Sequence, residues 1–458
     1  MGTNAAKTLA IDGRRQALLA AGIAAIAVAF ALIAPALWNG YPLLQYDTGG
    51  YLARFYEGYL VPSRSTVFGY YLHFGEDTHF WINVELQALA TVWILQATMR
   101  VFGLTRPVQL VMVGLALALT TALPWLTSLL LTDIFAGLSV LSLFLLVVHG
   151  EKFGRFERGA LFIFTAFAVS SHNATLAVLA GLCLAAWLVR PFFPAQVSLR
   201  GTLAGTLSLV AGALMLLAAN FAMSGKLAWT PGGYGIAFSR ILQDGIVERY
   251  LDDNCFREDL KLCPYRHALP ATGDKFLWGR SMFDRLGRFD GLGDEMRHIV
   301  LASLASYPGQ HLATALTSTL RQLTMVATGE GVHSNIMHTQ KIIERYLPGQ
   351  TPYMQTSRQH RGHMSFENLN RVHESVAYGS MLMIAMFFGY ALWRRKLDDF
   401  ALLTATVTLA ILGNAFACGA LSGPHDRYGS RMVWIATFAM LIILMRSFGP
   451  RTGRSSRL

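Results

Sequence analysis

Residues 131–149 read LTDIFAGLSVLSLFLLVVH, and this stretch decides the class of fold. Asp133 is its one formally charged residue, and most of the other side chains are apolar. A helix needs roughly 20 such residues to cross a hydrocarbon core about 30 Å thick, and it satisfies its own backbone hydrogen bonds while doing so. The stretch therefore predicts a transmembrane helix.

Apolar stretches of this kind recur along the chain. We expect spans at residues 16–38, 81–103, 107–124, 131–149, 159–170, 173–189, 201–222, 375–393, 399–418 and 431–447. Hydrophobic residues make up 53% of the 458 positions and charged residues 14%, with a mean hydropathy of +0.40. A soluble domain usually carries about 25% charged residues. We therefore predict an all-α polytopic membrane protein with about ten transmembrane helices.

The net charge of +11 would indicate a nucleic-acid partner in a soluble protein, but its distribution here predicts topology instead. Basic residues fall mainly in alternate short connections and at the termini: Lys7, Arg14, Arg15, Arg100, Arg106, Lys152, Arg155, Arg158, Arg190, Arg200, Arg394, Arg395, Lys396, Arg446, Arg451, Arg454 and Arg457. The short connections on the other side hold Arg54, Arg64, Arg427 and Arg431. The positive-inside rule then places both termini in the cytoplasm of a bacterial inner membrane, with no nucleic-acid partner.

One segment tests this topology, because 158–189 could form one long tilted helix or two short helices. A single helix would place Arg394, Arg395 and Lys396 outside the cell. The charge distribution favours a break at residues 170–173.

The chain divides into three predicted parts. Residues 1–222 form an N-terminal transmembrane module that contains the first periplasmic loop, 39–80. Residues 223–374 form a large, mainly helical periplasmic loop domain, and 375–458 form a C-terminal module of three helices. A moderately apolar helix at 310–327 is expected to lie along the membrane surface, although the pattern alone also permits membrane insertion.

Four cysteines bear on the compartment. Cys255 and Cys263 lie in the large loop with seven residues between them, and an oxidising compartment allows them to form a disulfide. Two free thiols or half of a metal site are the alternatives. Cys183 and Cys418 lie in predicted helices.

Polar residues gather where the predicted topology places the periplasmic face. Such residues cost free energy at membrane depth and are therefore candidates for a function. Four groups do so: Asp47 with Tyr51 and Arg54; Asp133; His172 with Asn173; and His425, Asp426, Arg427 and Tyr428. We expect Asp47, Asp133 and Arg427 to share one cavity, because each would be costly to bury without partners.

Each candidate also has a structural alternative. Asp47, beside an apolar boundary, could act as a general base or could cap a surface helix. Asp133 could be catalytic, or it could only stabilise the N-terminus of its helix through the helix dipole. His172 could be a hydrogen-bonded polar residue at the break between two short helices. Arg64 and Arg427 present planar forks of donors that suit phosphate, although interface arginines also snorkel.

Taken together, these features resemble the GT-C superfamily of integral-membrane glycosyltransferases. The resemblance lies in an acidic residue in the first periplasmic loop, a second one opening the fourth helix, short fifth and sixth helices, a large loop after the seventh, and the Arg427-Tyr428 pair before a late helix. It covers the architecture of most of the chain. The superfamily includes protein mannosyltransferases, lipid A aminoarabinose transferases and oligosaccharyltransferases, and these enzymes use polyprenyl-phosphate-linked sugars as donors.

The resemblance implies that Asp47 is the catalytic acidic residue of the first loop and Asp133 the acidic residue of the fourth helix. The first loop lacks the paired acidic residues of several members, and no Trp-Trp-Asp motif occurs. These departures put metal dependence and peptide acceptors in doubt. No cofactor is implied with certainty, and the sequence supports no metal site.

We therefore expect an inverting glycosyltransferase that transfers a sugar from a polyprenyl-phosphate-linked donor to an envelope lipid, glycan or other acceptor on the periplasmic face. Asp47 would deprotonate the acceptor, and Arg64 or Arg427 would hold the departing phosphate. A transporter or flippase for a lipid-linked glycan is one alternative, and a non-catalytic membrane assembly subunit is another. Membrane lipids are partners in every case.

Overall fold

The computed structural model describes residues 2–58, 60–230 and 233–448, and within these ranges the chain is helical without a strand. One isolated bridge pairs Leu43 with Leu129. The prediction of an all-α fold is therefore confirmed for the described residues.

The helices fall into three consecutive groups. The first holds α1 (Gly2–Asn39), α2 (Tyr46–Glu57), α3 (Thr66–Phe74), α4 (Trp81–Val101), α5 (Pro107–Thr120), α6 (Leu123–Ser128), α7 (Asp133–His149), α8 (Arg155–Ser171), α9 (Asn173–Val189) and α10 (Leu199–Ser224). The second holds α11 (Gly233–Gln243), α12 (Ile246–Asn254), α13 (Gly273–Leu277), α14 (Met282–Arg285) and α15 (Arg288–Ser306). The third holds α16 (Pro308–Leu323), α17 (Met337–Tyr346), α18 (Thr351–Thr356), α19 (Glu367–Trp393), α20 (Asp399–Leu421) and α21 (Asp426–Phe448).

All ten predicted spans fall on helices, and six helices are long and apolar enough to cross a membrane by length and composition. These are Arg15–Asn39 of α1, Asp133–Lys152, Leu199–Ser224, Glu367–Trp393, Asp399–Leu421 and Asp426–Ser447. Helices α5 and α9 are apolar but shorter. The composition is that of a helical membrane protein, and the number of ten spans stays a prediction.

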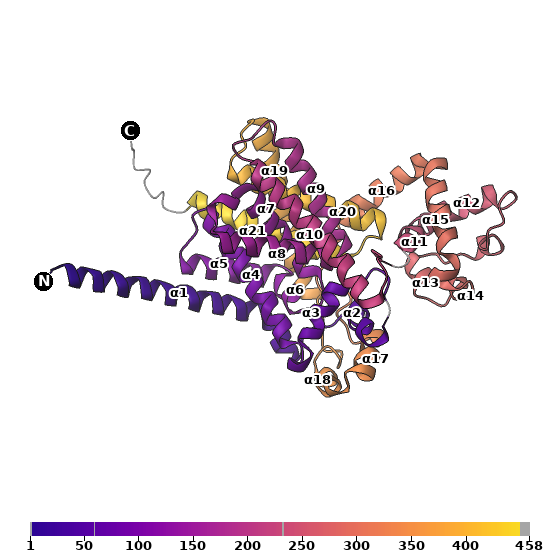
Figure 1. Cartoon of the computed structure of the whole chain (residues 1–458), viewed down its shortest axis with the longest axis horizontal. Coiled ribbons are helices and arrows are strands. Elements are labelled where there is room, and N and C mark those ends of the chain that lie inside the picture. The colour runs from indigo at the N-terminus through magenta and orange to yellow at the C-terminus, as the bar shows by residue number, and fades with distance from the viewer. Residues whose placement is uncertain (1, 59, 231–232, 449–458) are drawn as a thin grey trace.

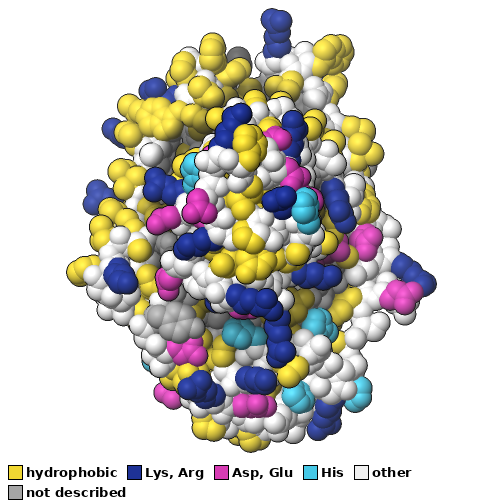
Figure 2. All heavy atoms as spheres, turned by 90° about the vertical axis from the view of Figure 1, so that its right-hand side faces the viewer, with side chains coloured by type: hydrophobic (Ala, Val, Ile, Leu, Met, Phe, Trp, Pro, Cys, Tyr) yellow, Lys and Arg dark blue, Asp and Glu magenta, His cyan; other side chains and the backbone are white. Residues whose placement is uncertain are grey.

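Figure 1 shows the long helices as a bundle, with the compact group α11–α15 at one end and the start of α1 at the other. We call α11–α15 the lobe and the adjacent end of the bundle the lobe end. Viewed from this side, basic, acidic and histidine side chains lie mixed with apolar ones over the surface (Figure 2).

Connections predicted to be cytoplasmic meet at the opposite end. Lys152 Nζ lies 3.4 Å from Asp399 Oδ2, and Arg100 pairs with Glu157. Arg451, Arg454 and Arg457 of the predicted cytoplasmic tail lie outside the described residues, as do the side chains of Lys7 and Arg14.

The predicted break within 158–189 is present at His172. Helix α8 ends at Ser171 and α9 begins at Asn173, while His172 itself has extended backbone angles (φ −155°, ψ 127°). Two helices of 17 residues each therefore replace one long helix.

Helix α7 is the centre of the bundle. Buried residues make up 89% of its apolar window, against 22% for α1, because α4, α8, α10 and α21 surround it. Gly137 allows the close approach of Trp434, whose Nε1 would lie 2.7 Å from a Cβ at that glycine. Asp133 at the start of α7 is consequently buried as well.

The predicted loop domain 223–374 contains two differently packed parts. The lobe has its own core, formed by side chains that include Phe238, Tyr250, Phe276, Phe283 and Met296. A disulfide joins Cys255 and Cys263 within it, which is the predicted pair, whereas Cys183 and Cys418 are buried free thiols. Residues after α16 instead pack on the first loop, where α17 covers α2.

Candidate active site

Helix α2 places Asp47 at the lobe end of the bundle. Gln45 is the N-cap, and its side chain accepts a hydrogen bond from the backbone N–H of Asp47 at 2.9 Å. The alternative that Asp47 caps this helix is therefore wrong. Asp47 lies in the first turn, where the helix dipole favours a carboxylate and the side chain is left for other partners.

Two arginines share the Asp47 carboxylate. Arg64 pairs with Oδ1, and Arg427 Nη1 lies 2.7 Å from Oδ2. Burial alone would raise the pKa of Asp47, but the two guanidinium groups outweigh it and hold the pKa below its usual value. Asp47 is therefore an anion at neutral pH, and about a fifth of its side chain is exposed.

Arg427 bridges Asp47 to the second predicted acid. Its Nε lies 2.7 Å from Asp133 Oδ2, and Arg431 Nη1 lies 3.3 Å from Asp133 Oδ1. The two residues that Arg427 pairs with are 380 and 294 positions away in the chain. The structure thus brings Asp47, Asp133 and Arg427 into direct contact, and their own side chains fill the space between them.

We call Asp47, Arg64, Asp133, Arg427 and Arg431 the ion-pair cluster. It holds three guanidinium groups and two carboxylates, which leaves an excess of one positive charge. The exposed fractions of these side chains range from 1% to 20%, so solvent screens the excess only weakly. Such an arrangement favours a bound anion.

Two predicted aromatic residues flank the cluster. The ring of Tyr428 lies under both arginines of α21, with its centroid 5.5 Å from Arg427 Cζ and 5.1 Å from Arg431 Cζ. Tyr51 is buried, and Arg64 Cζ lies 5.8 Å from its centroid. These rings add cation–π contacts that hold the guanidinium groups in place.

Arg431 belongs to the cluster although the sequence analysis assigned it no role. It also donates to Asn414 Oδ1 at 2.9 Å and contacts Cys418 Sγ at 3.1 Å. Its spacing of four residues from Arg427 puts both side chains on one face of α21, and this spacing was the available signal.

Glu330 was missed too, and no local pattern marks it. Its carboxylate pairs with His425 Nδ1 at 2.7 Å and accepts the backbone N–H of Arg427 at 2.7 Å. The hydrogen bond that His425 donates to Glu330 raises the pKa of His425. Burial would raise the pKa of Glu330, but His425 and the Arg427 backbone hold it below its usual value. Glu330 thereby fixes the start of α21.

His172 lies close enough to the cluster for the charges of its arginines to shift the pKa of the imidazole. Burial lowers the pKa of His172, and Arg431 and Arg427 lower it further, so the imidazole is neutral. Its Nδ1 is buried and has no hydrogen-bond partner among the described residues. The described residues therefore leave this nitrogen unsatisfied.

The other two predicted binding residues lie outside the cluster. Arg54 donates to Thr66 Oγ1 at 2.6 Å and to the carbonyls of Val61 and Arg64, so it supports the loop that carries Arg64. Asn173 is exposed and accepts a hydrogen bond from Trp229 Nε1 at 3.0 Å.

Helix α17 holds α2 in position. Thr339 Oγ1 donates to the Gln45 carbonyl at 2.8 Å and accepts the Gly49 N–H at 2.9 Å. A Cβ at Gly49 would lie 2.7 Å from Thr339 Cα, so only glycine permits this approach. Thr339 is nearly 300 positions from Asp47, and sequence spacing could not have revealed it.

The described residues contain no group of three or more His, Cys, Asp or Glu side chains placed to hold a metal ion. Comparison with protein-family models, curated protein sequences and solved structures finds no match to this chain.

Proposed function

We propose that the chain is a membrane glycosyltransferase of the GT-C type, which moves a sugar from a polyprenyl-phosphate-linked donor to an envelope lipid, glycan or other acceptor. The observation that supports this proposal is the sharing of the Asp47 carboxylate by Arg64 and Arg427. The site would face the periplasm, as the distribution of basic residues predicts.

The excess positive charge of the ion-pair cluster suits the phosphate of such a donor. Arg64 and Arg427 each present a planar fork of N–H donors, which matches the oxygens of a phosphodiester. Arg431 and Asp133 are buried behind Arg427 and keep it oriented. The neutral His172, with its free Nδ1, is available for a sugar hydroxyl or a phosphate oxygen.

The same contacts explain how Asp47 would become a base. Between two arginines its proton affinity is low, and the carboxylate is a weak base. A donor phosphate that engages Arg64 and Arg427 draws these cations away from Asp47, and the pKa of Asp47 then rises toward its ordinary value. Binding of the donor thus prepares the residue that activates the acceptor.

The reaction is an inverting displacement. The acceptor oxygen forms a bond to the anomeric carbon while the bond from that carbon to the phosphate oxygen breaks. The polyprenyl phosphate leaves with the electron pair, and Asp47 takes the acceptor proton. Arg64 and Arg427 stabilise the charge that develops on the leaving phosphate, and a water-poor site strengthens this effect.

A transporter is less well supported. Transporters commonly hold substrate near the bilayer midplane between repeated halves, whereas the cluster lies at the starts of α2, α7 and α21, at one end of the bundle. An assembly subunit would have no use for a charged and partly exposed Asp47.

Replacement of Asp47 tests the proposal. We expect a deletion strain to lack a sugar-bearing envelope lipid or glycan, which mass spectrometry would detect. The wild-type chain should restore this species and Asp47→Asn should reduce its formation by about 10²-fold or more. Asp77→Asn is the matched control, because Asp77 is an exposed acid close by in the chain. Full activity of a folded, membrane-inserted Asp47→Asn protein would exclude Asp47 as the base.

A further inference from the structure

Helix α16 has two unlike faces. Leu312, Leu316 and Leu320 are four residues apart, which places them on one face, and their exposed fractions are 72%, 59% and 56%. On the opposite face Ser318 and Gln322 are buried. The backbone carbonyl of Ser318 would lie 2.7 Å from a Cβ at Gly419, so this glycine lets α16 pack directly on α20.

The end of α16 lies between the last turns of α20 and the start of α21, where Gln322 hydrogen-bonds to the backbone of His425. Gln322 and Leu323 line a small cavity together with Ile411 and Asn414 of α20. Helix α20 ends at Leu421, and the ten residues from Ile411 to that end correspond to about 15 Å along the axis. Since α20 is a candidate span, α16 descends alongside it and does not lie across its end.

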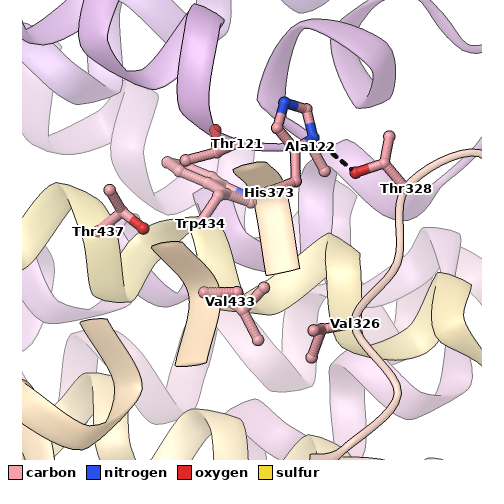
Figure 3. A pocket seen from close by; sticks show the side chains of 9 residues that line it. Thr121, Ala122, Val326, Thr328, His373, Val433, Trp434 and Thr437 are labelled. Carbon is pink, nitrogen blue, oxygen red and sulfur yellow. Dashed lines mark hydrogen bonds between the residues drawn. The ribbon is translucent and has the colours of Figure 1, made fainter. Parts of the chain in front are cut away.

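The chain then returns to the lobe end without forming a helix. Val326 and Thr328 line a second cavity with Val433, Trp434 and Thr437 of α21, as Figure 3 shows. Only two residues after Thr328, Glu330 is bonded to the first turn of α21. The segment from Pro308 to Gly331 therefore enters and leaves the bundle at the same end.

Side chains of neighbouring helices satisfy the backbone of the returning segment. The contacts run from Tyr378 Oη to the Thr324 carbonyl (2.6 Å), from Gln322 Nε2 to the Met325 carbonyl (3.3 Å), from the Ala327 N–H to Asp426 Oδ1 (3.0 Å), and between Asn370 and both backbone groups of Thr328 (2.8 and 3.1 Å). Water would satisfy these groups in a surface loop. Irregular backbone at membrane depth persists only when protein groups replace that water.

Packing on the inner side of this segment is close. Both cavities beside it have volumes of about 10 Å³, which is roughly the space of one water molecule. The face that carries Leu312, Leu316 and Leu320, which we call the leucine face, is not packed in this way, because no described residue covers it. Helix α20, on which α16 packs, also carries exposed apolar side chains, among them Leu409, Leu412 and Phe416.

We propose that residues 308–331 form a re-entrant element of the membrane domain, whose leucine face contacts the acyl chains of the leaflet at the lobe end. Lipid is the partner because α16 packs along α20, a candidate membrane span that itself exposes apolar side chains. This role is independent of the proposed enzymatic activity. It also explains why a helix of moderate hydrophobicity packs along α20 and why polar side chains satisfy the backbone that follows it.

Nitroxide labels test the proposal in protein reconstituted into phospholipid nanodiscs. Leu316→Cys and Leu320→Cys are labelled singly, and the accessibility of each label to oxygen and to a water-soluble nickel chelate is measured. Leu409→Cys on α20 gives the lipid reference, and Phe256→Cys, 71% exposed on the lobe, gives the water reference. The native free thiols are buried, and unsubstituted protein measures their background labelling.

We expect labels at positions 316 and 320 to match the one at 409, with high oxygen and low nickel accessibility. Nickel accessibility equal to that at 256 would place α16 in water and overturn the proposal. Protection from both reagents would show that protein, such as a second copy of the chain, covers this face, and it would overturn the proposal equally. Two label positions guard against a local folding defect, and none of the readouts depends on catalysis.

Discussion

Arg427 is the residue that holds two carboxylates together at the candidate site. Asp47 and Asp133 would repel each other in a weakly screened environment, and the guanidinium group between them removes this repulsion. Arg431 provides the second cation for Asp133. The stability of the site should therefore depend on residues that touch no substrate.

Replacement of Arg431 by Met should destabilise the protein strongly. Arg431 and Asp133 are each 1% exposed, so the change leaves a buried carboxylate with one cation fewer. Breaking a buried pair usually costs about 3–5 kcal/mol. The control is Arg100→Met, whose pair with Glu157 is largely exposed and should contribute about 0–1 kcal/mol. Unfolding in mixed micelles measures both, and equal losses would contradict the assignment.

The His425–Glu330 pair predicts a pH dependence. The raised pKa of His425 contributes stability below its unfolded value of 6.5, and this contribution is lost as pH rises through the folded pKa. The lowered pKa of Glu330 contributes stability above 4.5, which is lost as pH falls through its folded pKa. Both contributions are complete between these two values.

Wild-type protein should therefore exceed His425→Gln in thermal stability most clearly between pH 4.5 and 6.5, and this margin should shrink in alkaline buffer. His363→Gln, at an exposed histidine, should show no such window. A margin that grows with rising pH would have the wrong sign.

The charged residues of the cluster could be found from the sequence because charge beside an apolar stretch is costly and therefore conspicuous. Asp47, Asp133 and Arg427 met this criterion. Glu330 and Thr339 did not, since a polar residue within a long polar loop carries no signal of its contacts. The prediction that Arg54 binds substrate failed for the same reason. The sequence does not distinguish an arginine that donates to loop carbonyls from one that faces a substrate.

At the scale of elements, hydropathy located the apolar helices of the bundle and helical periodicity located α16, but neither located the short helices of the first loop. The first loop, 39–80, folds into α2 and α3, whose amphipathic turns are too short for a clear period. Helix α16 was expected from its sequence, but its packing on α20 was not, and this packing depends on Gly419, where a side chain would keep the two helices apart. A local sequence pattern cannot reveal the close approach of a glycine to a residue far away in the chain.

Gly49→Ala should disturb the site through the contact of α2 with α17. The added methyl group would lie 2.7 Å from Thr339 Cα, so one of the two helices must move. Overpacking of this kind usually costs about 1–3 kcal/mol. We expect lower thermal stability together with reduced transferase activity, because Asp47 is two residues away. Gly389→Ala is the control, since a Cβ at Gly389 meets nothing within 4 Å.

At the scale of the whole molecule, polar chemistry and basic connections occupy opposite ends of the bundle. The cluster lies where α2, α7 and α21 begin, and Lys152, Asp399, Arg100 and Glu157 meet at the far end. The break at His172 makes this separation possible, because an unbroken helix from α8 through α9 would exchange the ends for every later segment.

This arrangement predicts the outcome of topology mapping. The segment after Gly225 leads into the lobe, and Arg395 lies in the connection between α19 and α20, at the end where Lys152 approaches Asp399. Reporter fusions after these two residues should give opposite signals, periplasmic for Gly225 and cytoplasmic for Arg395, since basic connections remain inside. A fusion after Arg190, between α9 and α10, should agree with Arg395.

If Gly225 and Arg395 reported the same side, an even number of crossings would separate them, and α10, α19 and the re-entrant segment could not be oriented as proposed. If both fusions reported the cytoplasm, the Cys255–Cys263 disulfide would lie in a reducing compartment, which does not favour such a bond.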